Sequence, residues 1–260
     1  MIGIFDSGVG GLTVAKAIKE SMPESKLIYF GDTARVPWGN KSPELVKKYS
    51  EEICDFLISK GAKTIVIACN TASAYAYDHL KGKYPQLKIY DAITPVVEKI
   101  ELENGGMDSV KIAVLGTRGT IGSGTYQRKI AEKVPGAEVI AKACPLFVPL
   151  AEEGLADSEI AKSVLDEYLH GIKDRGVDMV VLGCTHYPLM KKGICGFFGE
   201  KTRCIGSDEE IARKLKAESA EGLAEASEDE FYFSDLSESY LELAGNIYGR
   251  KIKAAKIDLQ

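Results

Sequence analysis

The sequence lacks several features that mark particular classes of protein. No apolar run approaches the roughly 20 residues that span a bilayer, and Asp6 interrupts the first apolar run too early for a signal peptide. The six cysteines include no C-x-x-C pair, which argues against a zinc ribbon and against a small disulfide scaffold. The net charge is −5 over 260 residues, so neither nucleic acid nor an anionic membrane surface is an expected partner. We therefore expect a cytoplasmic globular protein.

The six cysteines fall into two groups. Without an export signal, all six are expected to be reduced thiols. Four are expected to be small buried hydrophobic residues, namely Cys54, Cys144, Cys195 and Cys204. Cys69 and Cys184 differ from these because polar residues follow each of them at once.

The chain is organised around the first of these two thiols. Residues 64–74 read TIVIACNTASA, in which the β-branched apolar run predicts a buried strand that ends at Cys69. Asn70, Thr71 and Ser73 then supply polar groups and a cap for the next helix. In open α/β sheets ligands bind at the carboxyl ends of the strands, which is where this thiol is expected.

A second stretch repeats this order. Residues 179–186 read MVVLGCTH: an apolar run, then Cys184, a small hydroxyl residue and a polar side chain. The shared order at nearly equal spacing along the chain predicts two similar halves, each with its own thiol. We expect Cys69 and Cys184 to lie on opposite walls of one cleft.

Predicted strands and helices alternate through most of the sequence. Strands are expected at residues 2–5, 26–32, 64–68, 87–93, 111–115, 138–143, 179–183 and 230–234. Helices are expected at residues 12–20, 43–61, 70–80, 158–173, 209–225 and 238–248, with a short helix after Pro95. A turn is expected at 104–106, and the acidic run at 225–230 is expected to be a solvated turn.

This alternation predicts an α/β fold of two similar parallel-sheet halves that face each other across a cleft. The first domain is expected to comprise residues 1–94 and 207–260, and the second residues 95–206. The C-terminal tail is too small to be a domain of its own, so it is expected to pack back on the first half.

A loop of small residues follows the first strand of each half. Residues 6–11 (DSGVGG) match neither the dinucleotide nor the P-loop glycine pattern, so a bound nucleotide is not indicated. Their three glycines suit a tight turn where the backbone approaches a ligand closely, and residues 116–120 (GTRGT) hold the same place in the second half. The single tryptophan, Trp38, lies in a loop between Pro37 and Gly39, where it either packs in the core or walls a pocket.

Two facing thiols predict a specific chemistry. One thiolate removes a proton from one face of a chiral carbon acid, and the other thiol donates a proton to the opposite face, with no cofactor required. Because a free thiol has a pKa of about 8.5, each needs assistance. Asp6 is the candidate for Cys69, and His186 is the candidate for Cys184. Either glutamate of the pair at 152–153 is placed to orient His186, or both are solvated turn residues.

Five motifs resemble those of the bacterial glutamate racemases. They are GIFDSGVGGLTV at 3–14, YFGDTARVPWG at 29–39, ACNTASA at 68–74, LGTRGT at 115–120 and LGCTHYPL at 182–189. The resemblance covers almost the whole chain and is weakest after residue 207. It implies cofactor-independent interconversion of L- and D-glutamate, which supplies D-glutamate for peptidoglycan, and it implies a homodimer.

The resemblance also implies roles for individual residues. Cys69 corresponds to the base that acts on D-glutamate, Cys184 to the base that acts on L-glutamate, and Glu152 to the carboxylate near the second cysteine. The family's substrate-contacting positions are occupied here by Asp6, Ser7, Trp38, Gly39, Asn70, Thr71, Thr117, Thr120, Thr185 and His186. Thr117 and Thr120 are expected to help hold the substrate carboxylates.

Two departures from the family pattern and two alternatives remain. Trp38 stands where tyrosine is usual, and residues 91–95 (DAITP) replace a segment that usually begins with glycine and ends in Glu-Pro. One alternative is a racemase of another small acidic amino acid such as aspartate, although those relatives tend to have glutamate at the position of His186 and histidine at that of Ser73. The other is a non-catalytic amino-acid-binding or regulatory protein, which has no need of two thiols.

Overall fold

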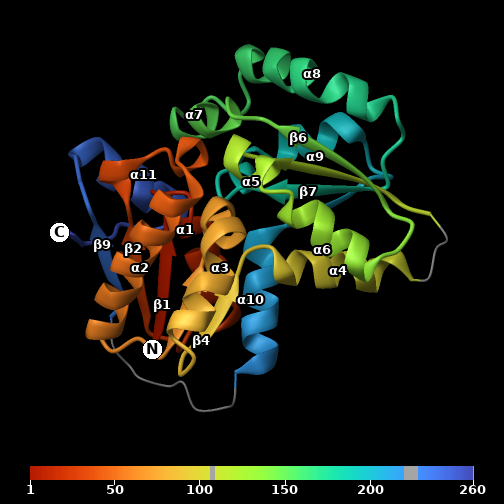
Figure 1. Ribbon diagram of the computed structural model, residues 1–260. Coiled ribbons are helices and arrows are strands. Elements are labelled where there is room, and N and C mark those ends of the chain that lie inside the picture. Colours follow the sequence, from red (N-terminus) through yellow and green to blue (C-terminus); the bar gives the residue numbers. More distant parts are fainter. Residues whose placement is uncertain (106–108, 220–227, 260) are drawn as a thin grey trace.

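Two separate parallel sheets form the core of the computed structural model, which describes residues 1–105, 109–219 and 228–259 (Figure 1). The first sheet has the strand order β10-β9-β2-β1-β3-β4. Its strands are β1 (Ile2–Asp6), β2 (Leu27–Gly31), β3 (Thr64–Ile67), β4 (Lys88–Asp91), β9 (Glu230–Phe233) and β10 (Ala254–Lys256). The second sheet, in the order β6-β5-β7-β8, comprises β5 (Lys111–Gly116), β6 (Glu138–Ala143), β7 (Met179–Gly183) and β8 (Arg203–Gly206). The predicted fold class is confirmed.

Helices cover both faces of each sheet. On the first sheet, α1 (Leu12–Ser21), α10 (Ser207–Glu218) and α11 (Glu238–Tyr248) cover one face, and α2 (Pro43–Ser59) and α3 (Asn70–Lys83) cover the other. On the second, α4 (Thr94–Asn104) and α6 (Thr125–Lys133) lie opposite α7 (Phe147–Glu152), α8 (Glu159–Lys173) and α9 (Lys191–Phe198). Because both faces are covered, neighbouring strand residues such as Ile4 and Phe5 enter different hydrophobic clusters and both are fully buried.

Several helices begin where the sequence places a capping side chain. The hydroxyl of Ser158 accepts a hydrogen bond from the N–H of Ala161 and starts α8, and Ser237 starts α11 in the same way. Ser42 caps α2, whose first residue is Pro43. None of the helices in the described part of the chain is both long and apolar enough to cross a membrane.

The order of strands places the functional edge. In each sheet the chain moves from the first strand to one side (β1 to β2, β5 to β6) and then crosses to the other (β3, β7). The carboxyl ends of β1 and β3 therefore flank one topological switch point, and those of β5 and β7 flank a second. Asp6 ends β1, Cys69 follows β3, Thr117 follows β5 and Cys184 follows β7, so each switch point carries one thiol.

The C-terminal segment packs on the first half, as predicted. Strand β9 pairs with β2 in parallel, while α10 and α11 contact α1. Strand β10, which the sequence did not predict, extends the sheet beyond β9. The division into residues 1–94 with 207–260 and residues 95–206 stays a prediction.

Two expectations for the C-terminal segment change, and the turn expected at 104–106 is met at Gly105. The side chain of Asp229 is only 1% exposed and accepts hydrogen bonds from Lys19, Leu27 and Tyr248, so this part of the acidic run is not a solvated turn. Helix α10 ends at Glu218, and the expected extension to residue 225 lies partly outside the described residues. Gly105 ends α4 with a left-handed backbone conformation, at a φ of 55°. Residue 106, also part of the expected turn, lies outside the described residues.

The expectation of six reduced thiols is wrong. Cys195 of α9 and Cys204 of β8 form a disulfide, because α9 leads back to the edge of the sheet and brings their Cα atoms to 6.1 Å. This approach depends on tertiary packing, and their spacing in the sequence does not reveal it. Cys54, Cys69, Cys144 and Cys184 are free and buried.

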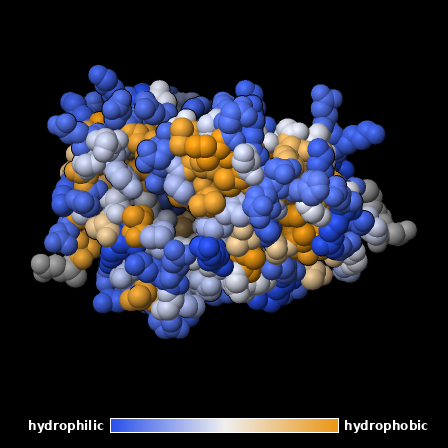
Figure 2. All heavy atoms as spheres, turned by 90° about the horizontal axis from the view of Figure 1, so that it is seen from above, coloured by the Kyte–Doolittle hydropathy of each residue, from blue (hydrophilic) through white to orange (hydrophobic). Residues whose placement is uncertain are grey.

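The top of the molecule in Figure 1 is formed around α7 and α8. Seen from above, hydrophobic residues gather near the middle of this face among hydrophilic ones (Figure 2). Large side chains exposed in this part of the chain include Leu146 before α7 and Ile160 in α8, with relative exposures of 50% and 60%.

Candidate active site

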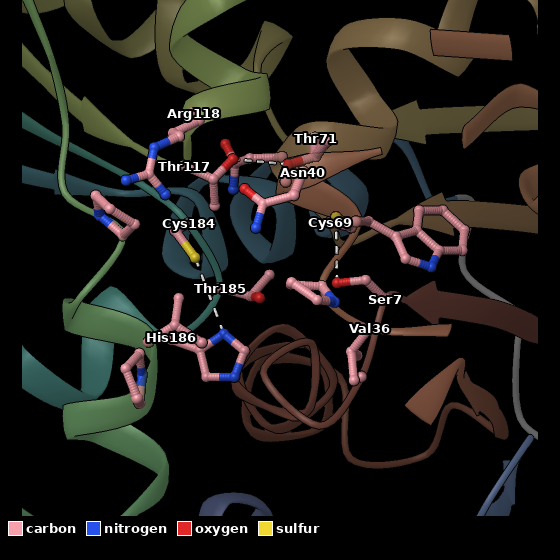
Figure 3. A pocket seen from close by; sticks show the side chains of 18 of the residues that line it. Ser7, Val36, Asn40, Cys69, Thr71, Thr117, Arg118, Cys184, Thr185 and His186 are labelled. Carbon is pink, nitrogen blue, oxygen red and sulfur yellow. Dashed lines mark hydrogen bonds between the residues drawn. The ribbon is translucent and has the colours of Figure 1, made fainter. Parts of the chain in front are cut away.

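A cavity of about 290 Å³ lies between the carboxyl edges of the two sheets. Cys69 and Cys184 both line it, from opposite sides (Figure 3). Its lining also includes Ser7, Asn70, Thr71, Thr117, Thr185 and His186. The structure thus brings together residues from the ends of four strands, as the paired motifs predicted.

Cys69 occupies the N-cap of α3. Its Sγ accepts a hydrogen bond from the N–H of Ala72 at 3.5 Å, and its thiol donates to Oγ of Ser7 at 3.6 Å. The cap is thus the cysteine itself, whereas the sequence predicted Asn70, Thr71 or Ser73, which lie inside the helix. Burial, reinforced by the charge of Asp6, raises the pKa of Cys69 to about 12, although the Ala72 N–H opposes the shift. Near neutral pH this pKa favours the protonated thiol.

Cys184 has a different environment. Nδ1 of His186 lies 3.9 Å from its Sγ, and Nε2 of His186 lies 2.8 Å from Oε1 of Glu152. Burial lowers the pKa of His186, but the hydrogen bonds with Cys184 and Glu152 outweigh it and raise that pKa to about 10. An imidazolium in this position stabilises negative charge on the Cys184 sulfur. Of the two glutamates at 152–153, Glu152 is the one that orients His186.

Asp6 is fully buried at the end of β1. Its Oδ2 accepts from the N–H of Gly8 at 2.9 Å, and its Oδ1 accepts from Oγ1 of Thr185 at 3.2 Å. Burial raises its pKa, while the charge of His186 and these hydrogen bonds oppose the rise. Among the hydrogen bonds of the described residues, Asp6 has none to Cys69. Asp6 lies at the edge of the first sheet, but its carboxylate is hydrogen-bonded to Thr185 of the Cys184 wall, and Ser7 is the residue hydrogen-bonded to the Cys69 sulfur.

Three threonines meet where the two halves approach each other. Oγ1 of Thr71 lies 2.9 Å from that of Thr117 and 3.2 Å from that of Thr120, and the latter two are 3.0 Å apart. Thr71 and Thr117 line the cavity, whereas Thr120 is fully buried behind them. Only the hydroxyls of Thr71 and Thr117 are therefore placed to meet a carboxylate in the cavity, while Thr120 supports them from behind.

Comparison with known proteins identifies this arrangement. A family model described as Asp/Glu/hydantoin racemase matches residues 12–206. The chain is 43% identical over 257 residues to a glutamate racemase of Geobacter metallireducens, covering 96% of this chain and 93% of that one. This chain belongs to the Asp/Glu/hydantoin racemase family. It is also 45% identical to a glutamate racemase of Aquifex aeolicus over 97% of this chain and 95% of that one.

A solved structure extends the similarity to the fold. The glutamate racemase of Francisella tularensis, crystallised in complex with D-glutamate, is 32% identical and superposes with a TM-score of 0.91. The match covers 100% of this chain and 97% of that chain. The racemase fold and its two-sheet architecture are therefore shared along the full length.

The loop after β2 closes one side of the racemase pocket. Trp38 both packs in the core and lines the cavity, so each of the two roles considered for it applies in part. Its indole N–H donates to Oδ2 of Asp32 at 3.1 Å. Gly39 lines the cavity beside it, and a Cβ there would lie 2.8 Å from Cβ of Thr117. Glycine at this position lets the loop approach the second half.

Sequence reasoning missed part of the lining. The missed residues are Gly8, Val36, Pro37, Asn40, Arg118, Pro145, Val148 and Pro149. Four of the missed residues lie inside motifs that resemble those of the family, so their position could have indicated that they line the pocket. These are Gly8, Val36, Pro37 and Arg118. Pro145, Val148 and Pro149 carry no reactive group and enter the pocket through the placement of α7. Within the described residues, no group of three or more His, Cys, Asp or Glu side chains is arranged to hold a metal ion.

Gly10 controls how closely the two walls approach. A Cβ at Gly10 would lie 2.5 Å from Nδ1 of His186 and 2.5 Å from Oγ1 of Thr185, closer than real Cβ atoms come to other atoms. Gly10→Ala is therefore expected to push the loop after β1 away from the Cys184 wall. Displacements of about 1 Å at a reacting centre cost about 10²-fold in rate, so we expect kcat/KM to fall by about that factor.

Steady-state racemisation by the purified variant measures this effect. Gly82→Ala in α3 is the control, since nothing lies within 4 Å of the Cβ it would add. It should keep wild-type activity and gain slightly in stability, because alanine favours a helix by roughly 0.5–1 kcal/mol over glycine. Wild-type activity in Gly10→Ala would show that the contact is not needed.

Proposed function

We propose that this racemase interconverts L- and D-glutamate without a cofactor, using Cys69 and Cys184 as the two bases. The observation that carries the proposal is the presence of two thiols on opposite sides of one pocket. The similarity to proteins named glutamate racemases supports glutamate as the substrate. It supports neither of the alternatives, a racemase of aspartate or a non-catalytic binding protein.

In the proposed reaction, Cys184 acts on L-glutamate. Its thiolate, stabilised by the His186 imidazolium, removes the α-proton, and the S–H of Cys69 donates a proton to the opposite face of the α-carbon. The product is D-glutamate, with the proton on Cys184 and the negative charge on Cys69. In the reverse direction the Cys69 thiolate takes the α-proton of D-glutamate and Cys184 donates.

The two thiols differ in their surroundings. Burial raises the pKa of Cys69 to about 12, whereas the Sγ of Cys184 lies 3.9 Å from Nδ1 of His186. In the proposed cycle Cys69 carries the proton when L-glutamate binds. After conversion of L-glutamate to D-glutamate, the proton must move from Cys184 back to Cys69 before the next turnover in that direction.

The substrate carboxylates need donors on both walls. The first N–H groups of α3, at Asn70 and Thr71, have no preceding turn to accept from them and begin a helix of 14 residues. The hydroxyls of Thr71 and Thr117 add polar groups around the same cavity, whereas the O–H of Thr185 already donates to Asp6. Such preorganised donors hold the substrate in place for proton transfer. Asp6, Ser7, Trp38, Gly39, Thr120 and Glu152 complete the proposed set of site residues.

Incubation of the purified protein with L-glutamate in D₂O tests the proposal. Optical rotation should decay to zero while deuterium enters the α-position, and the product should be the racemate. The same course is expected after treatment with EDTA and without added pyridoxal phosphate. Loss of activity on chelation, or exchange without loss of rotation, would contradict a cofactor-free two-base racemase. L-aspartate serves as the control substrate and should react far more slowly.

The cellular role is part of the same proposal. D-Glutamate made by this reaction would enter peptidoglycan synthesis in the cytoplasm, where its precursors are assembled. A homodimer remains a prediction, which light scattering at assay concentrations checks.

A further inference from the structure

Tyr126 is a buried tyrosine that the proposed mechanism does not use. It belongs to α6 of the second half and is fully buried. Its hydroxyl donates to Oδ1 of Asn70 at 2.8 Å, across the boundary between the two halves. Nδ2 of Asn70 in turn donates to Oγ of Ser207 at 3.2 Å. All three side chains are at most 2% exposed, so water competes little with either bond.

The three residues lie at the starts of three helices. Asn70 is the first residue of α3, Ser207 is the first residue of α10, and Tyr126 is the second residue of α6. The chain of hydrogen bonds therefore joins the second half, the Cys69 helix and the helix through which the chain returns to the first half. The two hydrogen bonds of the Asn70 side chain thereby fix the position of the first turn of α3.

The ring of Tyr126 lies beside the strand that leads to Cys184. A Cβ added to Gly183, which directly precedes Cys184, would lie 3.3 Å from its Cε2. The ring is thus next to one thiol's strand, while its hydroxyl holds the helix that begins beside the other thiol. Burial raises the pKa of Tyr126 well above its ordinary value, so the hydroxyl keeps its proton and remains a donor.

We propose that Tyr126 is a positioning residue of the racemase, which fixes the first turn of α3 through Asn70. This inference rests on the proposed function, because that turn carries the main-chain N–H groups assigned to a substrate carboxylate. A residue with this role affects how well the substrate is held more than how fast the proton moves. Its loss should therefore change KM more than kcat.

Tyr126→Phe removes only the hydroxyl and tests the proposal. We expect KM for L- and D-glutamate to rise about 3- to 10-fold, the range that one buried hydrogen bond contributes, with kcat changed less than twofold. Tyr84→Phe is the matched control. Tyr84 is 7% exposed and its hydroxyl donates to Asp55 at 2.6 Å, and neither residue lines the pocket. The Tyr84→Phe variant also loses one hydroxyl hydrogen bond, and its KM should stay at the wild-type value.

A double-mutant cycle separates positioning from a general structural effect. In an Asn70→Ala background, Tyr126→Phe should have no further effect on KM, since the two residues act as one unit. Ser207→Ala removes the other hydrogen-bond partner of Asn70 and should also raise KM by about 3- to 10-fold. This variant serves as the test if Tyr126→Phe does not fold. An unchanged KM in a folded Tyr126→Phe or Ser207→Ala variant, or a full effect of Tyr126→Phe in the Asn70→Ala background, would overturn the proposal.

The wild-type enzyme measured alongside distinguishes failure of the proposed function from failure of the positioning role of Tyr126. A wild type that does not racemise glutamate would refute the proposed function and, with it, this role of Tyr126. If the wild type is active and the KM of Tyr126→Phe equals the wild-type KM, only the positioning role would be refuted.

Discussion

Replacement of either Cys69 or Cys184 by serine is expected to stop glutamate racemisation while glutamate still binds. Each thiol faces the cavity from its own wall, so neither can reach both faces of the α-carbon. A serine hydroxyl is nearly the same size as a thiol but is a much weaker acid. It therefore neither ionises to remove the α-proton nor donates a proton to the α-carbon as the thiol does. General acid–base groups contribute 10²- to 10⁴-fold, and we expect a loss of about 10³-fold or more in each variant.

Binding and turnover must be measured separately to test this expectation. Calorimetry should give glutamate affinities within about tenfold of the wild type, or about 1.4 kcal/mol, while racemisation is lost in both directions. Cys54→Ser is the matched control, since Cys54 is a buried free cysteine of α2 outside the pocket lining. Near-normal turnover by either pocket variant would refute the two-base mechanism.

The parts of this site that the sequence predicted are those encoded locally. An apolar strand followed at once by a cysteine and polar residues places that cysteine at the carboxyl end of a sheet, whatever surrounds it. The same pattern at residues 64–74 and 179–186 was enough to place Cys69 and Cys184 on two walls. The alternation of strands and helices likewise depends on local periodicity, which is why the fold class was confirmed.

The parts that the sequence did not predict depend on contacts between distant segments. Cys69 caps its own helix because its Sγ faces the N–H of Ala72, whereas residue type alone favoured Asn70, Thr71 or Ser73. Asp229 became a buried hydrogen-bond acceptor only through segments far from it in the sequence. The disulfide arose in the same way, from the return of α9 to the sheet edge.

Asp6 is the case in which local order and tertiary contact differ most. Its place after β1 made it the candidate assistant of Cys69, yet its Oδ1 is bound by Thr185 of the Cys184 wall. Its charge also raises the pKa of Cys69, so it opposes formation of the thiolate it was expected to assist. His186, in contrast, contacts Cys184 directly. The two assistants are therefore unequal.

This inequality predicts a directional effect. The two enantiomers have equal free energies, so kcat/KM for racemisation is the same in both directions and hides any asymmetry. Substrates with a leaving group that eliminates after α-proton removal report one thiol at a time. On these, His186→Asn should slow elimination from the L-substrate 10²- to 10⁴-fold and affect the D-substrate much less, since it removes the group that stabilises the Cys184 thiolate.

Asp6→Asn should change elimination by no more than about tenfold, below the usual range for a general base, and should not slow the D-substrate selectively. The reason is that Asp6 has no hydrogen bond to Cys69 among the described residues, and asparagine removes the negative charge that disfavours the Cys69 thiolate. Single-turnover elimination from each enantiomer measures both variants, with Cys54→Ser again as the control. Equal slowing of both enantiomers in both variants would show that Asp6 and His186 shape the pocket as a whole. A preference for the opposite enantiomer in His186→Asn would assign that residue to Cys69.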